Sequence, residues 1–167
     1  MDAQVLIAGV GMVPFRRPGK SDPYDVMAEA AVRAALADAR LDYDLVDQAF
    51  AGFVLADSCS GQRALYRVGI SGIPITNVSN NCASGSTALY LARQAVLAGE
   101  AECALAVGFE EMRPGALDRV FPQLADPLER HRDCVGEAMG FGEAERAMPP
   151  ALQLFSAQLE WMRREVG

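Results

Sequence analysis

Cys82 is the residue of this sequence whose type and position best suit covalent chemistry. It follows a short apolar run at 75–79 and the polar pair Asn80 and Asn81, and a segment with helical spacing of apolar residues begins just after it. A thiol at a helix N-terminus lies near free backbone N–H groups and the positive end of the helix dipole, which favour a thiolate. The small residues at 83–86 would let a substrate carbonyl approach the backbone. Two interpretations are open: a nucleophile, or a small buried residue at a tight turn.

A helix terminus alone does not make such a thiol reactive at neutral pH. An ordinary cysteine has a pKa of about 8.5, and a helix dipole contributes at best about 2 kcal/mol, where one pKa unit corresponds to about 1.4 kcal/mol. A base or a cation nearby must supply the remainder. The single histidine, His131, lies in the charged stretch PLERHRD. We expect it to be a solvated surface residue and not the base for Cys82.

The other three cysteines give no metal or disulfide pattern. Cys59, Cys103 and Cys134 form no CxxC pair, and one histidine does not complete a zinc site. Reduced thiols are therefore expected. Cys103 lies in the apolar run CALAVGF and is predicted to be a buried core thiol. We expect Cys59 and Cys134, in polar surroundings, to have no chemical role.

Alternating strand and helix patterns must position Cys82. Apolar, β-branched runs predict four strands, and amphipathic stretches between them predict three helices. The strands are predicted at 5–10, 48–55, 75–79 and 102–109, and the helices at 22–40, 62–68 and 84–98. Asp22 is the expected N-cap of the first helix, with Pro23 as its first residue. Gly52 in the second strand indicates a close approach of the backbone.

This βαβαβαβ order predicts an α/β fold with a mostly parallel sheet of about four strands, covered by helices. In such sheets ligands bind at the carboxyl ends of the strands, and the turn that carries Cys82 lies there. After the fourth strand, prolines divide a weaker tail in which 135–147 and 152–166 have helical composition. The fold and the thiol chemistry therefore point to the same edge of the sheet.

Composition argues against several classes of protein. With 15 basic and 22 acidic residues the net charge is -7, which gives no electrostatic reason for nucleic acid binding. No stretch approaches the roughly 18 uninterrupted apolar residues of a membrane span, and the N-terminus lacks the pattern of a signal peptide. The 51% hydrophobic content is typical of a globular domain. We therefore expect a cytoplasmic protein without a membrane span.

One long segment resembles a known family. The run from Asn80 to Leu117, NNCASGSTALYLARQAVLAGEAECALAVGFEEMRPGAL, is similar to the nucleophile segment of thiolases, most specifically the sterol carrier protein X type of 3-ketoacyl-CoA thiolase. AGFVLADSCSGQRALYRVGISGIPI and the opening LIAGVGMVPF extend the resemblance over about 4–117. The resemblance implies that Cys82 is the catalytic cysteine that becomes acylated. It also implies a coenzyme A thioester as substrate, with no further cofactor and no metal.

The resemblance also implies a domain division. Residues 1–117 would form the thiolase-like amino-terminal α/β domain, incomplete in this sequence. Residues 118–167 would form the start of the loop domain that covers the acyl-CoA, and this part is expected to be partly helical. Glu110, Glu111 and Met112 would border the active site, and ordinary solvated side chains are the alternative.

The second half of the thiolase family has no counterpart in this sequence. That half carries the histidine that activates the nucleophile, the acid/base cysteine and part of an oxyanion hole. The chain alone is therefore expected to be nearly inactive. A complementary carboxyl-terminal chain or a homo-oligomer is the expected partner, because the counterpart of 73–78 lies at the dimer interface of thiolases.

Three functions remain open. The first is the amino-terminal part of a thiolase-type acyl-CoA acyltransferase, acting in 3-ketoacyl-CoA thiolysis or the reverse Claisen condensation through an acylated cysteine. The second is a thiolase-like aldolase subunit of sterol side-chain breakdown, although such relatives do not depend on this cysteine. The third is a non-catalytic half-domain that binds a partner chain.

Overall fold

The computed structural model describes residues 4–113, 121 and 123–166. The chain divides into two compact units, Met1–Asp118 and Arg119–Gly167, and each is described by itself. The expected domain boundary between residues 117 and 118 lies outside the described residues. None of the described helices is long and apolar enough to cross a membrane.

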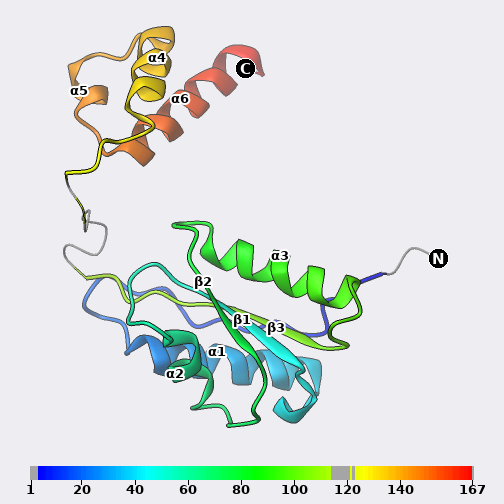
Figure 1. Cartoon of the computed structure of the whole chain (residues 1–167). Coiled ribbons are helices and arrows are strands. Elements are labelled where there is room, and N and C mark those ends of the chain that lie inside the picture. The colour runs from blue at the N-terminus through cyan, green and yellow to red at the C-terminus, as the bar shows by residue number, and fades with distance from the viewer. Residues whose placement is uncertain (1–3, 114–120, 122, 167) are drawn as a thin grey trace. The chain divides into compact units, whose positions relative to one another are not determined.

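Three parallel strands form the sheet of the first unit, in the order β2-β1-β3 (Figure 1). The central strand β1 (Gln48–Gly52) pairs with β2 (Ile75–Val78) on one side. On its other side it pairs with β3 (Ala104–Gly108). Because all three strands run in the same direction, their carboxyl ends share one edge of the sheet.

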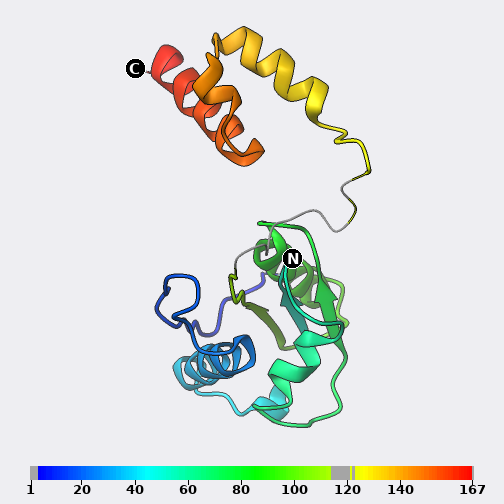
Figure 2. The same cartoon turned by 90° about the vertical axis from the view of Figure 1, so that its left-hand side faces the viewer.

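Helices cover both faces of this sheet. Helix α3 (Ser84–Leu97) lies on one face, and α1 (Tyr24–Ala39) and α2 (Ser60–Leu65) lie on the other (Figures 1 and 2). Side chains alternate along β1, so that Phe50 packs toward α3 while the alanines on either side of it pack toward α1 and α2. The predicted α/β fold with a parallel, helix-covered sheet is confirmed.

Helix α1 begins differently from the prediction. Asp22 does not cap it, because Pro23 stands at the N-cap position and no side chain caps the helix from there. The Tyr24 N–H instead donates to Oε2 of Glu111 at 3.1 Å. The local prediction was wrong because a distant residue supplies the acceptor. Arg40, with a left-handed φ of 55°, ends the helix where the end was predicted.

The strand predicted at 5–10 is absent, so the described sheet has three strands and not about four. The segment instead packs its backbone against α1: a Cβ on Gly9 would lie 2.5 Å from the carbonyl oxygen of Ala35. The Val10 N–H donates to Oδ2 of Asp38, in the same helix, at 2.9 Å. Because Gly9 has no side chain, the backbone of this segment can contact the backbone of α1. Both edges of the central strand β1 are already paired, with β2 and with β3.

Within its described residues the second unit contains the helices α4 (Glu129–Met139), α5 (Glu143–Arg146) and α6 (Pro150–Glu165). Helix α4 packs against α6. The segment predicted at 152–166 agrees with α6. The segment predicted at 135–147 is only partly correct, because α4 already begins at Glu129 and Gly140, with a φ of 70°, separates it from α5. A glycine in this conformation is a common end for a helix because it has no Cβ to clash.

Candidate functional site

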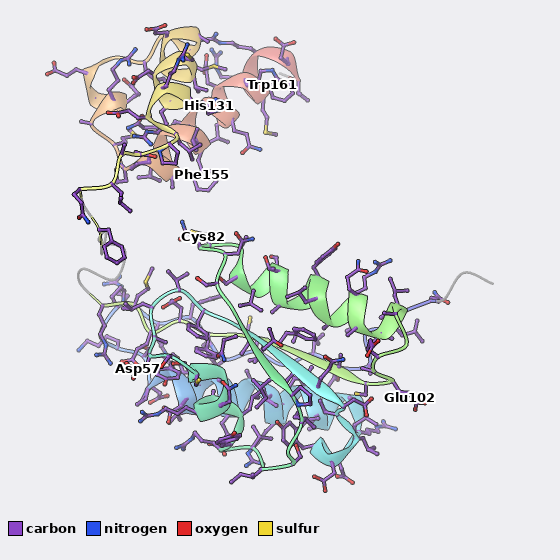
Figure 3. The ribbon with its side chains drawn as sticks, viewed as in Figure 1. Asp57, Cys82, Glu102, His131, Phe155 and Trp161 are labelled. Carbon is purple, nitrogen blue, oxygen red and sulfur yellow. The ribbon has the colours of Figure 1, made fainter. Side chains whose placement is uncertain are left out.

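Cys82 lies between β2 and α3, beyond the carboxyl end of β2 (Figure 3). Its side chain is exposed, so the interpretation as a small buried residue is wrong. Helix α3 starts two residues later, with Ala83 at the N-cap. In the described part of the chain, the N–H groups of Gly85 and Ser86 have no backbone or side-chain acceptor. These groups and the helix dipole make the surroundings of the thiol favourable to negative charge.

Ser84 fixes the backbone of the turn that carries Cys82. Its buried hydroxyl donates to the carbonyl oxygen of Asn81 at 2.7 Å and accepts the N–H of Asn80 at 2.8 Å. The Ser84 N–H also donates to the Asn81 carbonyl oxygen, at 3.1 Å. These bonds hold Asn81 in the left-handed region, with a φ of 47°, which asparagine tolerates better than most residues.

Glycines bring the start of α3 into backbone contact with the sheet. Gly52 ends β1, Gly108 ends β3, and the two are paired in register. A Cβ on Gly52 would lie 2.5 Å from the carbonyl carbon of Ser84, and a Cβ on Gly108 would lie 3.4 Å from Cα of Gly85. The close approach expected at Gly52 is confirmed. It sets the turn of Cys82 against the carboxyl ends of two strands.

Three aromatic rings stack on the other face of the same strand ends. Phe53 and Tyr24 each stack on Phe109, with ring centroids 5.2 and 5.1 Å apart. Phe53 and Phe109 directly follow the two glycines, so their side chains point to the opposite face, where α1 packs. At the carboxyl ends of β1 and β3, a glycine therefore leaves room for α3 on one face of the sheet, and the phenylalanine that follows it packs on the other face.

A pair of amides fixes β2, the strand that leads to Cys82. The side-chain amide of Asn77 donates to Oε1 of Gln62 at 2.7 Å, and its oxygen accepts the N–H of Gly61 at 2.7 Å. Gln62 in turn donates to the backbone carbonyl of Ile75 at 3.0 Å. Because Gly61 and Gln62 belong to α2, these bonds tie that helix to the strand before the site.

Glu110 and Glu111 hold backbone segments in place. Glu110 accepts the N–H groups of Val54 and Leu55 at 2.8 and 3.1 Å, which fixes the chain as it leaves β1. Glu111 forms an ion pair with Arg113. This guanidinium is the main cause, and the Tyr24 N–H at the start of α1 the second cause, of a pKa of the Glu111 carboxyl below its ordinary value. Both carboxylates therefore have structural partners and are not simply solvated.

The remaining cysteines and Met112 add no polar contact to the thiol of Cys82. Met112, Cys59 and Cys134 are exposed. Cys103 is half-buried rather than fully in the core, and burial, followed by the nearby Asp47 carboxylate, raises the pKa of its thiol. These positions agree with the expectation that all four cysteines are reduced.

The sulfur of Cys82 has one hydrogen-bonding neighbour among the described residues. Its Sγ lies 3.8 Å from Oδ1 of Asn81. His131 is exposed on α4 in the second unit, as expected of a solvated histidine. Over residues 4–113, 121 and 123–166, no group of three His, Cys, Asp or Glu side chains is placed to hold a metal ion.

Residues 5–135 match the family described as "Thiolase, N-terminal domain". The chain belongs to the thiolase family. "Sterol carrier protein 2" of Oryctolagus cuniculus is 46% identical over 165 residues, which cover 96% of this chain and 29% of that protein. "Benzoylsuccinyl-CoA thiolase subunit BbsB" of Thauera aromatica is 34% identical over 112 residues, 66% of this chain and 29% of that subunit.

A solved structure shares the thiolase fold of this chain. Acetyl-CoA acetyltransferase from Syntrophomonas wolfei gives a TM-score of 0.58 at 18% identity, over 83% of this chain and 43% of that chain. The present thiolase-family chain spans only 29% of the length of each of the two curated relatives named above. The resemblance inferred from 80–117 and its flanks is confirmed, including its relation to the sterol carrier protein type.

Sequence reasoning selected Cys82 but missed the side chains that shape its turn. For Ser84 a signal was present, because a serine at the start of a helical pattern is a typical hydrogen-bonding partner for nearby backbone. The left-handed conformation of Asn81 follows from that partner. Asn77 had no comparable signal, since its partner Gln62 lies in a separate helix.

Proposed function

We propose that this chain is the nucleophile-bearing part of a thiolase-type acyl-CoA acyltransferase, with Cys82 as its catalytic residue. The observation that carries the proposal is the exposed thiol at the start of α3, inside the segment 5–135 that matches the thiolase N-terminal domain. The proposed substrate is a 3-ketoacyl-coenzyme A thioester, and this chemistry needs no metal and no further cofactor.

The proposed reaction is acyl transfer through a thioester on Cys82. The thiolate uses an electron pair to bond to the keto carbon, and the bond between that carbon and the adjacent methylene carbon breaks. The released carbanion takes up the proton that the thiol lost, which gives acetyl-CoA. The thiol of free coenzyme A then attacks the carbonyl carbon of the thioester, and the bond between that carbon and the Cys82 sulfur breaks. The acyl group leaves as acyl-CoA, and the proton of the coenzyme A thiol goes to the Cys82 sulfur. The same steps in reverse form a carbon–carbon bond by Claisen condensation.

The surroundings of Cys82 support attack on a carbonyl group. The thiol is exposed, and the residues that follow it, Ala83 and Gly85 among them, have small side chains or none. The free N–H groups at the start of α3 and the helix dipole contribute roughly 0.3 to 1 kcal/mol toward negative charge. A contribution of this size does not by itself make a thiol reactive at neutral pH, so a base is still required.

The base is the part of the proposed mechanism that the first unit does not supply. The only histidine of the sequence, His131, belongs to the second unit and is exposed there. We therefore propose that a complementary carboxyl-terminal thiolase chain brings the activating histidine and the acid/base cysteine to Cys82. A second copy of this chain is the proposed neighbour of β2, whose outer edge has no strand partner within the described residues.

Intact-mass spectrometry after incubation with a 3-ketoacyl-CoA tests the function. The full chain is expected to gain the mass of one acyl group slowly, and faster with a carboxyl-terminal thiolase chain present. The Cys82→Ala variant is expected to gain none. Cys59→Ala is the matched control, because Cys59 is also an exposed thiol directly before a helix. It should retain the adduct.

The alternatives give different results in the same experiment. An adduct that persists in Cys82→Ala rules out the proposed nucleophile. If no adduct forms in the wild-type chain with or without the complementary chain, a non-catalytic half-domain becomes the better description. Retro-aldol cleavage that survives Cys82→Ala would instead indicate an aldolase subunit.

A further inference from the structure

The amide of Asn81 is the polar side chain in contact with the sulfur of Cys82. Oδ1 of Asn81 lies 3.8 Å from Sγ. In the described part of the first unit, no ion pair and no charged hydrogen-bond partner reaches this sulfur. Any direct hydrogen-bond assistance to the thiol from this unit therefore comes from an uncharged amide.

The backbone conformation of Asn81 brings its amide to the sulfur. Its φ is 47°, and its carbonyl oxygen is held by both the hydroxyl and the N–H of Ser84. The neighbouring Asn80 has the same side chain, but its amide donates to Oγ1 of Thr87 at 2.9 Å and is engaged there. The two asparagine amides of the turn therefore have different partners: that of Asn81 contacts Cys82, and that of Asn80 contacts Thr87.

A carboxamide can serve both protonation states of a thiol. Its oxygen accepts a hydrogen bond from S–H, and a half-turn about the Cβ–Cγ bond presents its nitrogen as a donor to a thiolate. Hydrogen bonds to an ionised acceptor are roughly twice as strong as those between neutral groups. In the observed contact the thiol donates to Oδ1. An amide N–H that is turned toward the sulfur stabilises a thiolate more than a neutral thiol.

We propose that Asn81 is a catalytic residue that donates a hydrogen bond from its amide to the ionised sulfur of Cys82, and that Ser84 positions it. The catalytic meaning of this inference rests on the function proposed above. Its direct effect is on the ionisation of the thiol, which is measurable without any acyl substrate.

The test is the pH dependence of Cys82 alkylation by iodoacetamide in the full chain, followed by peptide mass spectrometry. Asn81→Gly removes the amide, and glycine adopts the left-handed φ without strain. Its rate profile is expected to shift to higher pH, so that alkylation at pH 7 slows about threefold. Asn81→Asp replaces the donor with a like charge, and a slowing of about tenfold is expected.

Asn80→Ala is the matched control. It removes an identical side chain one residue away while keeping the backbone N–H that Ser84 accepts. Its alkylation profile should coincide with that of the wild type, and circular dichroism verifies that each variant is folded. A wild-type profile in folded Asn81→Gly, or an equal shift in Asn80→Ala, would overturn the assignment.

The acyl adduct of the wild-type chain, measured in parallel, separates this inference from the proposed function. A shifted alkylation profile in Asn81→Gly without any wild-type acyl adduct supports the hydrogen bond and contradicts acyl transfer. An acyl adduct in the wild type together with an unshifted alkylation profile in Asn81→Gly supports acyl transfer and contradicts the hydrogen bond. Faster acylation in Asn81→Gly than in the wild type would also contradict a catalytic amide.

Discussion

The backbone of Gly52 touches the backbone of Ser84: a Cβ on Gly52 would lie 2.5 Å from the Ser84 carbonyl carbon. Gly52 ends the central strand of the sheet, and Ser84 begins the helix that follows Cys82. The missing side chain at position 52 therefore decides how close this helix comes to the strand ends.

Gly52→Ala should separate the start of α3 from the sheet. The added methyl group meets backbone atoms that no side-chain rotation can move, so we expect a loss of about 1 to 3 kcal/mol in the free energy of unfolding. Far-UV circular dichroism in urea measures it. Fluorescence is unsuitable because Trp161, the only tryptophan, lies in the second unit.

Gly85→Ala is the control for that substitution. A Cβ there would meet only Cα of Gly108, at 3.9 Å, which is ordinary contact. Helix propensity favours alanine over glycine, so the variant should be neutral or more stable by up to about 1 kcal/mol. Equal destabilisation of both variants would mean that the backbone contact at Gly52 is not the cause.

Ser84→Ala should loosen the turn that carries Cys82. The Asn80 N–H and the Asn81 carbonyl oxygen each lose a partner, for an expected cost of about 1 to 3 kcal/mol in urea unfolding. Iodoacetamide labelling of Cys82 should slow as well, because the turn no longer fixes Asn81. Ser86→Ala, at an exposed position of the same helical turn, should change stability by less than about 0.5 kcal/mol.

Asn77→Leu should detach β2 from α2. The N–H of Gly61 and the side chain of Gln62 lose their partner in a partly buried place, with an expected cost of about 1 to 3 kcal/mol. Hydrogen exchange of the backbone amides in α2 should accelerate. Thr76→Ala, at the exposed neighbouring position, is the control and should leave the exchange of α2 unchanged. An exchange rate of α2 equal to wild type in Asn77→Leu would show that Asn77 does not hold β2 against α2.

Asp47→Asn should remove an acid-sensitive contribution to stability. The Asp47 carboxylate accepts the N–H groups of Cys103 and Glu102 at 2.9 and 2.8 Å, and these bonds, that of Cys103 first, lower its pKa. A lowered folded pKa means that the contribution is present above the unfolded value of about 3.9 and is lost as pH falls through the folded value.

The wild type should therefore unfold at a higher temperature than Asp47→Asn at pH 7, and the difference should shrink below about pH 4. Asp44→Asn is the control, because Asp44 is exposed and has no hydrogen-bonded partner among the described residues. A difference that stays constant from pH 7 into acid would show that the charge of Asp47 is not responsible.

Much of the fold follows from local patterns. The apolar runs at 48–55, 75–79 and 102–109 predicted three strands that the structure contains, since β-branched and apolar runs between turn residues favour strands. The run at 5–10 has the same composition but is not a strand. Most of its large apolar side chains remain exposed, and Gly9, with Gly11 just after the run, lets the segment lie against α1 instead.

Glu110 and Glu111, which follow β3, have hydrogen-bond partners that are distant in the sequence. Their sequence position allowed either a role beside the site or simple solvation. In the structure Glu110 accepts backbone N–H groups after β1, and Glu111 caps α1. Such partners are far away along the chain, so composition and spacing carry no information about them.

By itself the sequence determined the family, the α/β class and the place of Cys82 between a strand and a helix, because each depends on residues adjacent in the chain. Only the tertiary structure decided how the thiol is presented. Its exposure and the close approach at Gly52 depend on how α3 meets the strand ends. That meeting is fixed by backbone packing between residues far apart in sequence, which no local pattern records.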